Sequence, residues 1–426
     1  MNFYNLKHKE EQLNFKEATI KGQGKDKGLF FPEDISKFSN EFLQNLPNLS
    51  NEEIAFQVMK DFAGDEIPEA ELRKIVAETI AFEIPLKKVT ENISVLELFH
   101  GPTLAFKDVG ARFMSRCLGY FLKNETRKVT VLVATSGDTG GAVANGFYDV
   151  EGIEVVILYP KNRVSPVQEK QLTALGKNIH ALEVNGSFDD CQALVKQAFS
   201  DESLNEKLLL TSANSINVAR WLPQQIYYVL ALKQWLKIHS ENPVICVPSG
   251  NFGNICAGIL AHHRGLPVEH FIAACNVNDV VPEYLRTEIL QPKETVATIS
   301  NAMDVGDPSN FVRILELFDK EFNQVKNKLS GYTIDDEETL KTIKRVEKDY
   351  GYVLDPHGAV AFVALEKYLA ENGGKGFFLE TAHPVKFPDS VEQATGKSVE
   401  IPKSLEELMK QEKFTTEINP QYEELK

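Results

Sequence analysis

The lysine at position 107 lies among apolar residues, in surroundings that suit carbonyl chemistry. Lys107 follows Leu104, Ala105 and Phe106. Apolar surroundings disfavour the charged form of an amine and so lower its pKa. The neutral amine is the form that attacks an aldehyde and gives a Schiff base. Composition alone favours a plainer interpretation, in which Lys107 is an ordinary exposed lysine on a helix.

Two turns rich in glycine and in hydroxyl or amide side chains follow apolar runs and precede predicted helices. The first covers residues 134–142 (Ala-Thr-Ser-Gly-Asp-Thr-Gly-Gly-Ala), and the second begins at residue 247 with Val-Pro-Ser-Gly-Asn-Phe-Gly-Asn. Free N–H groups at a helix N-terminus bind anions, and glycines let a phosphate approach the backbone. A helix cap and a tight turn explain the first equally well. The second has neither the P-loop spacing nor the dinucleotide-binding spacing.

A third polar run, residues 211–220 (Thr-Ser-Ala-Asn-Ser-Ile-Asn-Val-Ala-Arg), also follows a predicted strand. Its last residue, Arg220, has a guanidinium fork suited to paired, charge-assisted hydrogen bonds with phosphate oxygens. Read alone, Arg220 is more often a surface charge, and Asn214 and Ser215 are turn residues.

A fourth run, residues 380–387 (Glu-Thr-Ala-His-Pro-Val-Lys-Phe), places Thr381 just after a short apolar strand. His383 and Lys386 follow it, and a solvated pair of polar side chains is an equally good interpretation of these two residues.

The elements that must position these residues alternate between short β-branched runs and helical stretches from about residue 128. We expect strands at residues 129–134, 154–159, 179–184, 208–211, 244–247, 271–275 and 377–380, and helices at 140–148, 189–199, 218–236 and 254–263. This alternation predicts an α/β fold with parallel sheets flanked by helices. Ligands of such sheets bind beyond the carboxyl ends of the strands, where the polar runs lie.

Composition and charge narrow the class of protein. The 426 residues carry 46 basic and 61 acidic side chains, a net charge of −15, which argues against a nucleic-acid surface. The five cysteines form no CxxC pair, so we expect no metal site built on them. No signal-peptide pattern and no apolar run of about 20 residues is present, so we expect a cytoplasmic protein with no membrane contact.

The uninterrupted string His-Gly-Pro-Thr-Leu-Ala-Phe-Lys-Asp at residues 100–108 resembles the cofactor-lysine segment of threonine synthases, a family of fold type II pyridoxal-phosphate (PLP) enzymes. Residues 25–32, 301–305, 308–311 and 354–359 also resemble the longer form of that family. The similarity extends from about residue 22 to residue 392. It implies a fold like that of the tryptophan synthase β chain, with a mostly helical N-terminal extension.

The resemblance implies a role for each polar run, with PLP held as a Schiff base by Lys107. It implies that Thr381 bonds the pyridine nitrogen and that Asp138 stands beside the cofactor, where many fold type II enzymes carry asparagine. His383 and Lys386 match residues near the rim of the active site, with no role assigned. The implied contacts of the cofactor phosphate are Gly250, Asn251, Phe252, Gly253 and Asn254; those of the substrate carboxylate are Thr135, Ser136 and Thr139; those of the substrate phosphate are Asn214, Ser215 and Arg220.

The activity that the resemblance implies is the last step of threonine biosynthesis, in which O-phospho-L-homoserine and water give L-threonine and phosphate. A PLP-dependent phospholyase or dehydratase releasing ammonia and 2-oxobutyrate would share Lys107, both glycine turns and Thr381. A non-catalytic relative that binds ligand is the third alternative. For the assembly, we expect a monomer or a homodimer.

The length indicates more than one domain. We expect a mostly helical domain at residues 1–95 and a large PLP-binding domain at residues 96–127 and 241–426. A smaller α/β domain is expected at residues 128–240.

Overall fold

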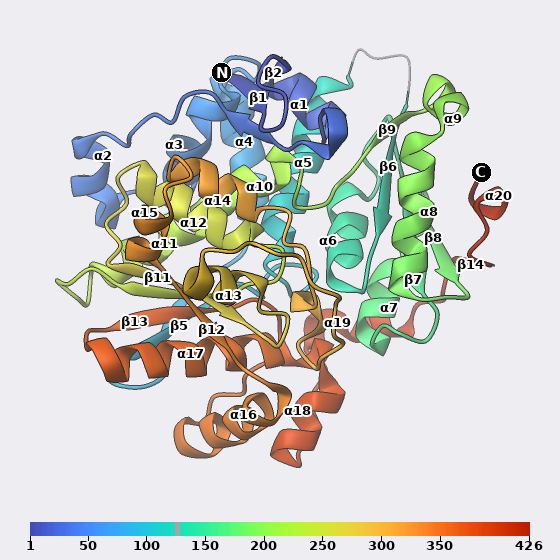
Figure 1. Ribbon diagram of the computed structural model, residues 1–426. Helices are drawn as coiled ribbons and strands as arrows, with labels where there is room; N and C mark the ends of the chain where they lie inside the picture. Colours follow the sequence, from blue (N-terminus) through green and yellow to red (C-terminus); the bar gives the residue numbers. More distant parts are fainter. Residues whose placement is uncertain (124–127) are drawn as a thin grey trace.

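The computed structural model describes residues 1–123 and 128–426, and its main feature is a pair of separate, largely parallel sheets (Figure 1). The larger sheet has six strands in the order β12-β11-β10-β13-β5-β4. Only β4 pairs antiparallel with its neighbour. The strands are β4 (Leu86–Lys88), β5 (Ile93–Glu97), β10 (Val244–Pro248), β11 (His270–Cys275), β12 (Leu329–Thr333) and β13 (Gly376–Glu380).

The smaller sheet has five parallel strands in the order β14-β8-β7-β6-β9. Its central strand β7 and its neighbour β6 are rich in valine, isoleucine and leucine, as strands covered by helices on both faces are. The strands are β6 (Val129–Ala134), β7 (Ile153–Pro160), β8 (Ile179–Val184), β9 (Leu209–Thr211) and β14 (Thr415–Ile418).

A third, antiparallel sheet opens the chain, with β1 (Asn2–Asn5) between β2 (Gln12–Asn14) and β3 (Phe30–Pro32). The helices around it are α1 (Phe15–Lys21), α2 (Asn40–Asn45), α3 (Asn51–Ala63) and α4 (Glu69–Thr79), with the short η1 (Lys25–Lys27) and η2 (Leu46–Asn48).

Helices cover the two larger sheets, and several begin directly after a strand at the polar runs. Those that position the candidate site are α5 (Lys107–Phe121), α6 (Asp138–Phe147), α7 (Pro166–Thr173), α10 (Val218–Trp221), α12 (Gly253–His263) and η5 (Pro384–Lys386). The others are α8 (Phe188–Ser200), α9 (Glu202–Lys207), η3 (Leu222–Gln224), α11 (Gln225–Trp235), α13 (Val280–Thr287), η4 (Asn301–Met303), α14 (Phe311–Leu317), α15 (Phe322–Lys328), α16 (Asp336–Tyr350), α17 (Pro356–Asn372), α18 (Pro388–Thr395), α19 (Lys403–Lys410) and α20 (Tyr422–Leu425).

The predicted alternation of strands and helices is present, with one break. The helix expected at residues 218–236 is divided into α10, η3 and α11. Pro223 lies at the first turn of η3, where its missing N–H prevents one continuous ladder of hydrogen bonds.

The predicted domain boundaries can be placed against the observed strands and the observed core. The boundary after residue 95 falls inside β5, a strand of the six-stranded sheet, and the boundary after residue 127 touches residues 124–127, which lie outside the described chain. Strand β14 lies far along the sequence but pairs with β8 in the smaller sheet, so the C-terminal end does not stay with the larger one (Figure 1). One cluster of buried side chains contains Phe15, Val131 and Ile245, which come from the N-terminal segment and from both larger sheets. The division into three domains stays a prediction.

No helix in residues 1–123 or 128–426 is long and apolar enough to cross a membrane.

Candidate active site

Lys107 lies at the carboxyl end of the six-stranded sheet, beside Thr381. The chain before Lys107 pairs with the chain that follows β13: the Phe106 N–H donates to the Thr381 carbonyl at 2.9 Å, and the His383 N–H donates to the Leu104 carbonyl at 3.0 Å. Two segments whose paired residues are 275 and 279 positions apart in the sequence are thereby held together. The structure thus brings Lys107 and Thr381 to the same place.

The amine of Lys107 is surrounded by protein and loses its proton readily. Burial lowers the pKa of Lys107 to about 8; the charge of Asp138 opposes this shift, while those of Lys386 and Arg220 add to it. The side chain keeps partial access to solvent, and its Nζ forms no hydrogen bond or ion pair with another described residue. Such an amine has a substantial neutral fraction near pH 8 and is free to bond a carbonyl carbon.

The turn between β6 and α6 uses one of its hydroxyls to hold its own shape. The buried Thr135 accepts hydrogen bonds through Oγ1 from the N–H groups of Gly137, at 3.0 Å, and Gly140, at 2.9 Å. Ser136 and Thr139 are only half-buried. Of the three residues predicted to contact the substrate carboxylate, Ser136 and Thr139 therefore have side chains open to a ligand, whereas the Thr135 hydroxyl shapes the loop.

Gly137 lies where that turn meets α7, and no other residue type fits there. Its φ of 136° is one that L side chains rarely adopt, and an added Cβ would stand 2.5 Å from the Gln168 side chain. Gln168 is fixed by a capping box with Ser165 at the start of α7. The close approach lets the Gln168 amide reach Asp138.

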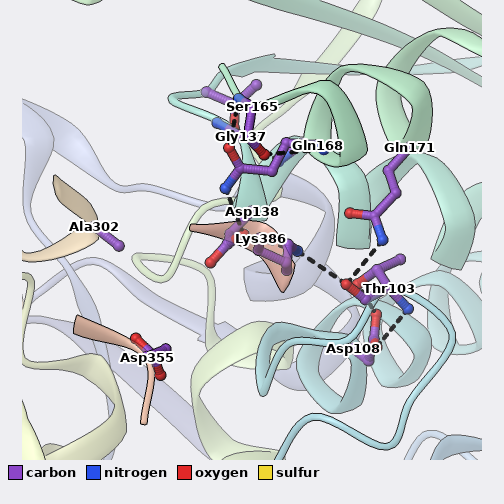
Figure 2. A network of polar contacts seen from close by, with 12 residues as sticks. Thr103, Asp108, Gly137, Asp138, Ser165, Gln168, Gln171, Ala302, Asp355 and Lys386 are labelled. Atoms are coloured by element: carbon purple, nitrogen blue, oxygen red, sulfur yellow. Dashed lines mark hydrogen bonds and ion pairs between the residues drawn. The ribbon is translucent and has the colours of Figure 1, made fainter. Parts of the chain in front are cut away.

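Asp138 carries a buried ion pair with Lys386. Lys386 Nζ lies 2.7 Å from Asp138 Oδ1, and Gln168 Nε2 donates to the same oxygen at 2.9 Å (Figure 2). Lys386 is fully buried, so neither the rim position nor the solvated pair expected from the sequence describes it. His383 is half-buried, and its Nδ1 accepts from the Val385 N–H at 3.1 Å, which caps η5.

The turn between β10 and α12 is a neutral, tightly packed loop. An added Cβ at Gly250 would stand 2.6 Å from Met303 Cα, so the backbones touch there. Phe252 has a left-handed φ of 60°, which turns the chain into α12. The first N–H groups of a helix have no partner within it. The buried Asn254 Nδ2 likewise has no hydrogen-bond partner among the described residues.

Ser215 belongs to this neutral loop rather than to the surroundings of Arg220. Its hydroxyl accepts from Asn251 Nδ2 at 2.8 Å and from Asn310 Nδ2 at 3.2 Å. Asn251 Oδ1 in turn accepts from the Ser309 N–H at 2.8 Å. The run at residues 211–220 therefore contributes Ser215 to the Gly250–Asn254 loop and Arg220 to a separate, buried position. Asn214, which is half-buried, lies directly before Ser215.

Arg220 is a buried cation without a carboxylate. Its Nη1 donates to the Ala213 carbonyl, while its Nε has no hydrogen-bond partner, and the described chain offers it no ion pair. Burial lowers the pKa of Arg220 to about 10, so it still carries its charge at neutral pH. An incoming anion would satisfy both the charge and the free N–H.

These groups fit PLP. An amine that loses its proton near pH 8, a helix N-terminus with a free amide beside it, and a threonine next to the amine match an aldehyde, a phosphate and a ring nitrogen.

Sequence reasoning named Lys386 without a role and missed the other residues that hold these groups in place. Lys386 Nζ and Gln171 Nε2 both donate to the Thr103 carbonyl, at 2.9 and 3.0 Å, and Thr103 donates its N–H to Asp108 at 2.9 Å (Figure 2). A lysine within an otherwise apolar run was the one available signal for Lys386. The glutamines of α7 gave none for this role, because the site residues that they contact, Asp138 and Thr103, lie 30 and 68 residues away along the chain.

Comparisons with known proteins define the class first. Residues 80–377 match the family model of the pyridoxal-phosphate dependent enzymes, and the chain belongs to that class. Residues 2–80 match the threonine synthase N terminus, and residues 358–426 match the threonine synthase C-terminal model. Within the class, the chain belongs to the threonine synthase family.

Similar proteins support this over nearly the whole chain. Threonine synthase of Escherichia coli is 47% identical over 407 residues, covering 96% of this chain and 94% of that one, and threonine synthase of Serratia marcescens is 47% identical over 95% and 93%. A crystal structure of the Escherichia coli enzyme matches with a TM-score of 0.92 at 45% identity, over 100% and 98% of the two chains. PLP-bound threonine synthase from Brucella melitensis matches with 0.94 at 35%, over the same shares.

The resemblance, the fold type II class and PLP as cofactor, all predicted from the sequence, are therefore confirmed. The roles of the individual site residues stay predictions.

Proposed function

We propose that this enzyme converts O-phospho-L-homoserine and water to L-threonine and phosphate. The observation that carries the proposal is the position of Arg220, a buried cation without a carboxylate, close enough to Lys107 to depress its pKa. An added Cβ at Gly110, one turn after Lys107 on α5, would stand 3.0 Å from Arg220 Nε, so an amine that handles protons and a candidate site for an anionic leaving group lie in the same region. A PLP enzyme that expels phosphate needs both.

Each part of the site has one task in this proposal. Bound PLP supplies an electron sink at the substrate α-carbon. The loop at residues 135–141 binds the substrate carboxylate through Ser136, Thr139 and the free N–H groups that begin α6. Arg220 and Asn214 bind the substrate phosphate, and the Gly250–Asn254 loop, with Ser215 against it, binds the cofactor phosphate.

Lys107 moves the protons. Its amine takes one proton from the α-carbon and a second from the β-carbon as phosphate leaves the γ-carbon. The same amine then returns one proton to the γ-carbon and one to the α-carbon. Water adds its hydroxyl at the β-carbon, and the proton that the water loses goes to the released phosphate. A pKa of about 8 suits this work, because a general base is most effective when its pKa lies near the working pH.

One assay tests the proposal. The purified protein is incubated with O-phospho-L-homoserine, and threonine, 2-oxobutyrate and phosphate are measured together. Equal amounts of threonine and phosphate are expected. Phosphate with 2-oxobutyrate in place of threonine would instead identify the phospholyase or dehydratase.

Lys107→Ala is expected to lower threonine formation by about 10³-fold or more, within the range that acid–base catalysis supplies. It should also remove the visible absorbance of the bound cofactor while leaving the far-UV circular dichroism unchanged. Lys196→Ala, at an exposed position of α8, is the matched control and should retain both activity and colour. Wild-type threonine production by Lys107→Ala would overturn the mechanism.

The cytoplasmic location and the choice between monomer and homodimer stay predictions from the sequence.

A further inference from the structure

Asp138 and Lys386 form a buried ion pair, and the charges of both residues affect the pKa of Lys107. Both side chains are at least nine-tenths buried, with relative exposures of 6% and 0%. A buried pair of this kind repays its desolvation only when the geometry is good and further hydrogen bonds satisfy both partners. Here Gln168 donates to Asp138, and Lys386 donates to the Thr103 carbonyl as well.

The pair and the hydrogen bond from Lys386 to the Thr103 carbonyl join three segments of the chain (Figure 2). Asp138 begins α6, which follows a strand of the five-stranded sheet. Lys386 ends η5, which follows β13 of the six-stranded sheet. Thr103 lies four residues before Lys107. A displacement of the Asp138 or the Lys386 segment would separate the charges, and a displacement of Thr103 would break the hydrogen bond to Lys386.

Asp138 is also the carboxylate that acts most strongly on Lys107, and its charge favours the protonated amine. The other groups near Lys107 do not favour its protonated form in this way. Arg220, on α10, repels a proton on Lys107. Asp108 is occupied by the Thr103 N–H and hydroxyl, and burial raises its pKa. Burial likewise raises the pKa of Tyr227, whose hydroxyl donates to the Phe106 carbonyl.

We propose that Lys386 is a positioning residue for Lys107: it serves as the counterion of Asp138 and so leaves the Lys107 amine without a carboxylate partner, in the neutral form that bonds a carbonyl carbon. The inference rests on Lys107 being the cofactor lysine, as in the proposed function. Two lysines thus lie near one carboxylate, and Lys386 is the one that forms an ion pair with it.

The test measures the proton affinity of Lys107 without using catalysis. The full-length chain is freed of cofactor and pulsed with trace acetic anhydride across a pH series, and mass spectrometry gives the acetylation rate of Lys107 relative to exposed lysines. The wild-type midpoint is expected near pH 8. Lys386→Met should raise that midpoint by about one unit or more, because an unpaired Asp138 then holds the proton on Lys107. Lys386→Arg, which keeps the charge, should leave it near the wild-type value.

A second pair of variants covers the case in which Lys386→Met does not fold. Asp138→Asn should lower the midpoint below the wild-type value, since Lys386 then acts on Lys107 only by repulsion. The double variant Asp138→Asn/Lys386→Met should bring it back toward pH 8. A midpoint that stays at the wild-type value in Asp138→Asn or in Lys386→Met would overturn the inference.

The two proposals fail separately. Shifted midpoints in an enzyme that makes 2-oxobutyrate would support the role of Lys386 and contradict the synthase activity. Unshifted midpoints in an enzyme that makes threonine would support the synthase activity and contradict the role of Lys386.

Discussion

Two buried cations lie close to Lys107, and their surroundings differ in one respect. Lys386 has a carboxylate 2.7 Å away and a carbonyl at 2.9 Å. Arg220 has a backbone carbonyl and an unsatisfied Nε, and none of the described carboxylates pairs with it. The protein's own side chains and backbone therefore satisfy Lys386, whereas Arg220 keeps one unsatisfied donor.

The difference separates a structural charge from a functional one. A buried charge with an unsatisfied donor is costly, and a bound anion can supply the missing partner. A buried charge with a full set of partners has nothing left to offer a ligand. We therefore infer that Lys386 sets the surroundings in which Lys107 works, and we propose that Arg220 binds the phosphate of the substrate.

The largest expected effect is on stability. Lys386→Met leaves Asp138 buried and unpaired, so the free energy of unfolding should fall by about 3–5 kcal/mol. Arg220→Met removes a cation that was never paired and should change it by no more than about 1 kcal/mol, roughly one ordinary hydrogen bond. Urea unfolding of both variants measures the contrast, and equal losses would erase the distinction between the two cations.

The next effect is on catalysis. Arg220→Gln should lower kcat/KM for O-phospho-L-homoserine by about 100-fold, because it removes charge-assisted hydrogen bonds of about 1.5–3 kcal/mol each. Phosphate release measures the rate, and the visible absorbance reports cofactor binding, which should be retained. Arg286→Gln, at an exposed arginine, is the control. If cofactor affinity fell in step with kcat/KM, Arg220 would belong to the scaffold and not to the substrate site.

The smallest effect is a dependence on pH. Burial by itself would raise the pKa of Asp138, but the charges of Lys386 and Lys107 outweigh it and hold that pKa well below its usual range. In the window between the folded and unfolded values, the unfolded chain binds the extra proton, so the pair stabilises the fold above about pH 4 and loses that contribution as the pH falls.

Between about pH 4 and pH 3 the wild type should therefore lose about 1 kcal/mol more than Asp138→Asn/Lys386→Met does, because the unfolded aspartate is only partly protonated over this range. Denaturant unfolding at several pH values across that window measures the slope. Parallel slopes would show that Asp138 is not held ionised by its partners.

Much of this site was predictable from the sequence, for a physical reason. Lys107, the two glycine turns and Thr381 each follow or adjoin a strand, and parallel sheets gather such positions at one edge. The alternation of strands and helices is a local property, so α6, α8 and α12 begin within two residues of the expected positions. Strand β14 was missed because its residues, Thr415–Ile418, are short, polar and paired only at the edge of a sheet.

The sequence by itself determined the fold class and the cofactor and predicted the amine that bonds it, because these depend on short, contiguous runs. Only the tertiary structure decided which charges face that amine. Lys386 and Asp138 are 248 positions apart, and so nothing in either run shows that one neutralises the other. The proton affinity of Lys107 is set by burial and by charges from three distant segments, which come together only when the chain has folded.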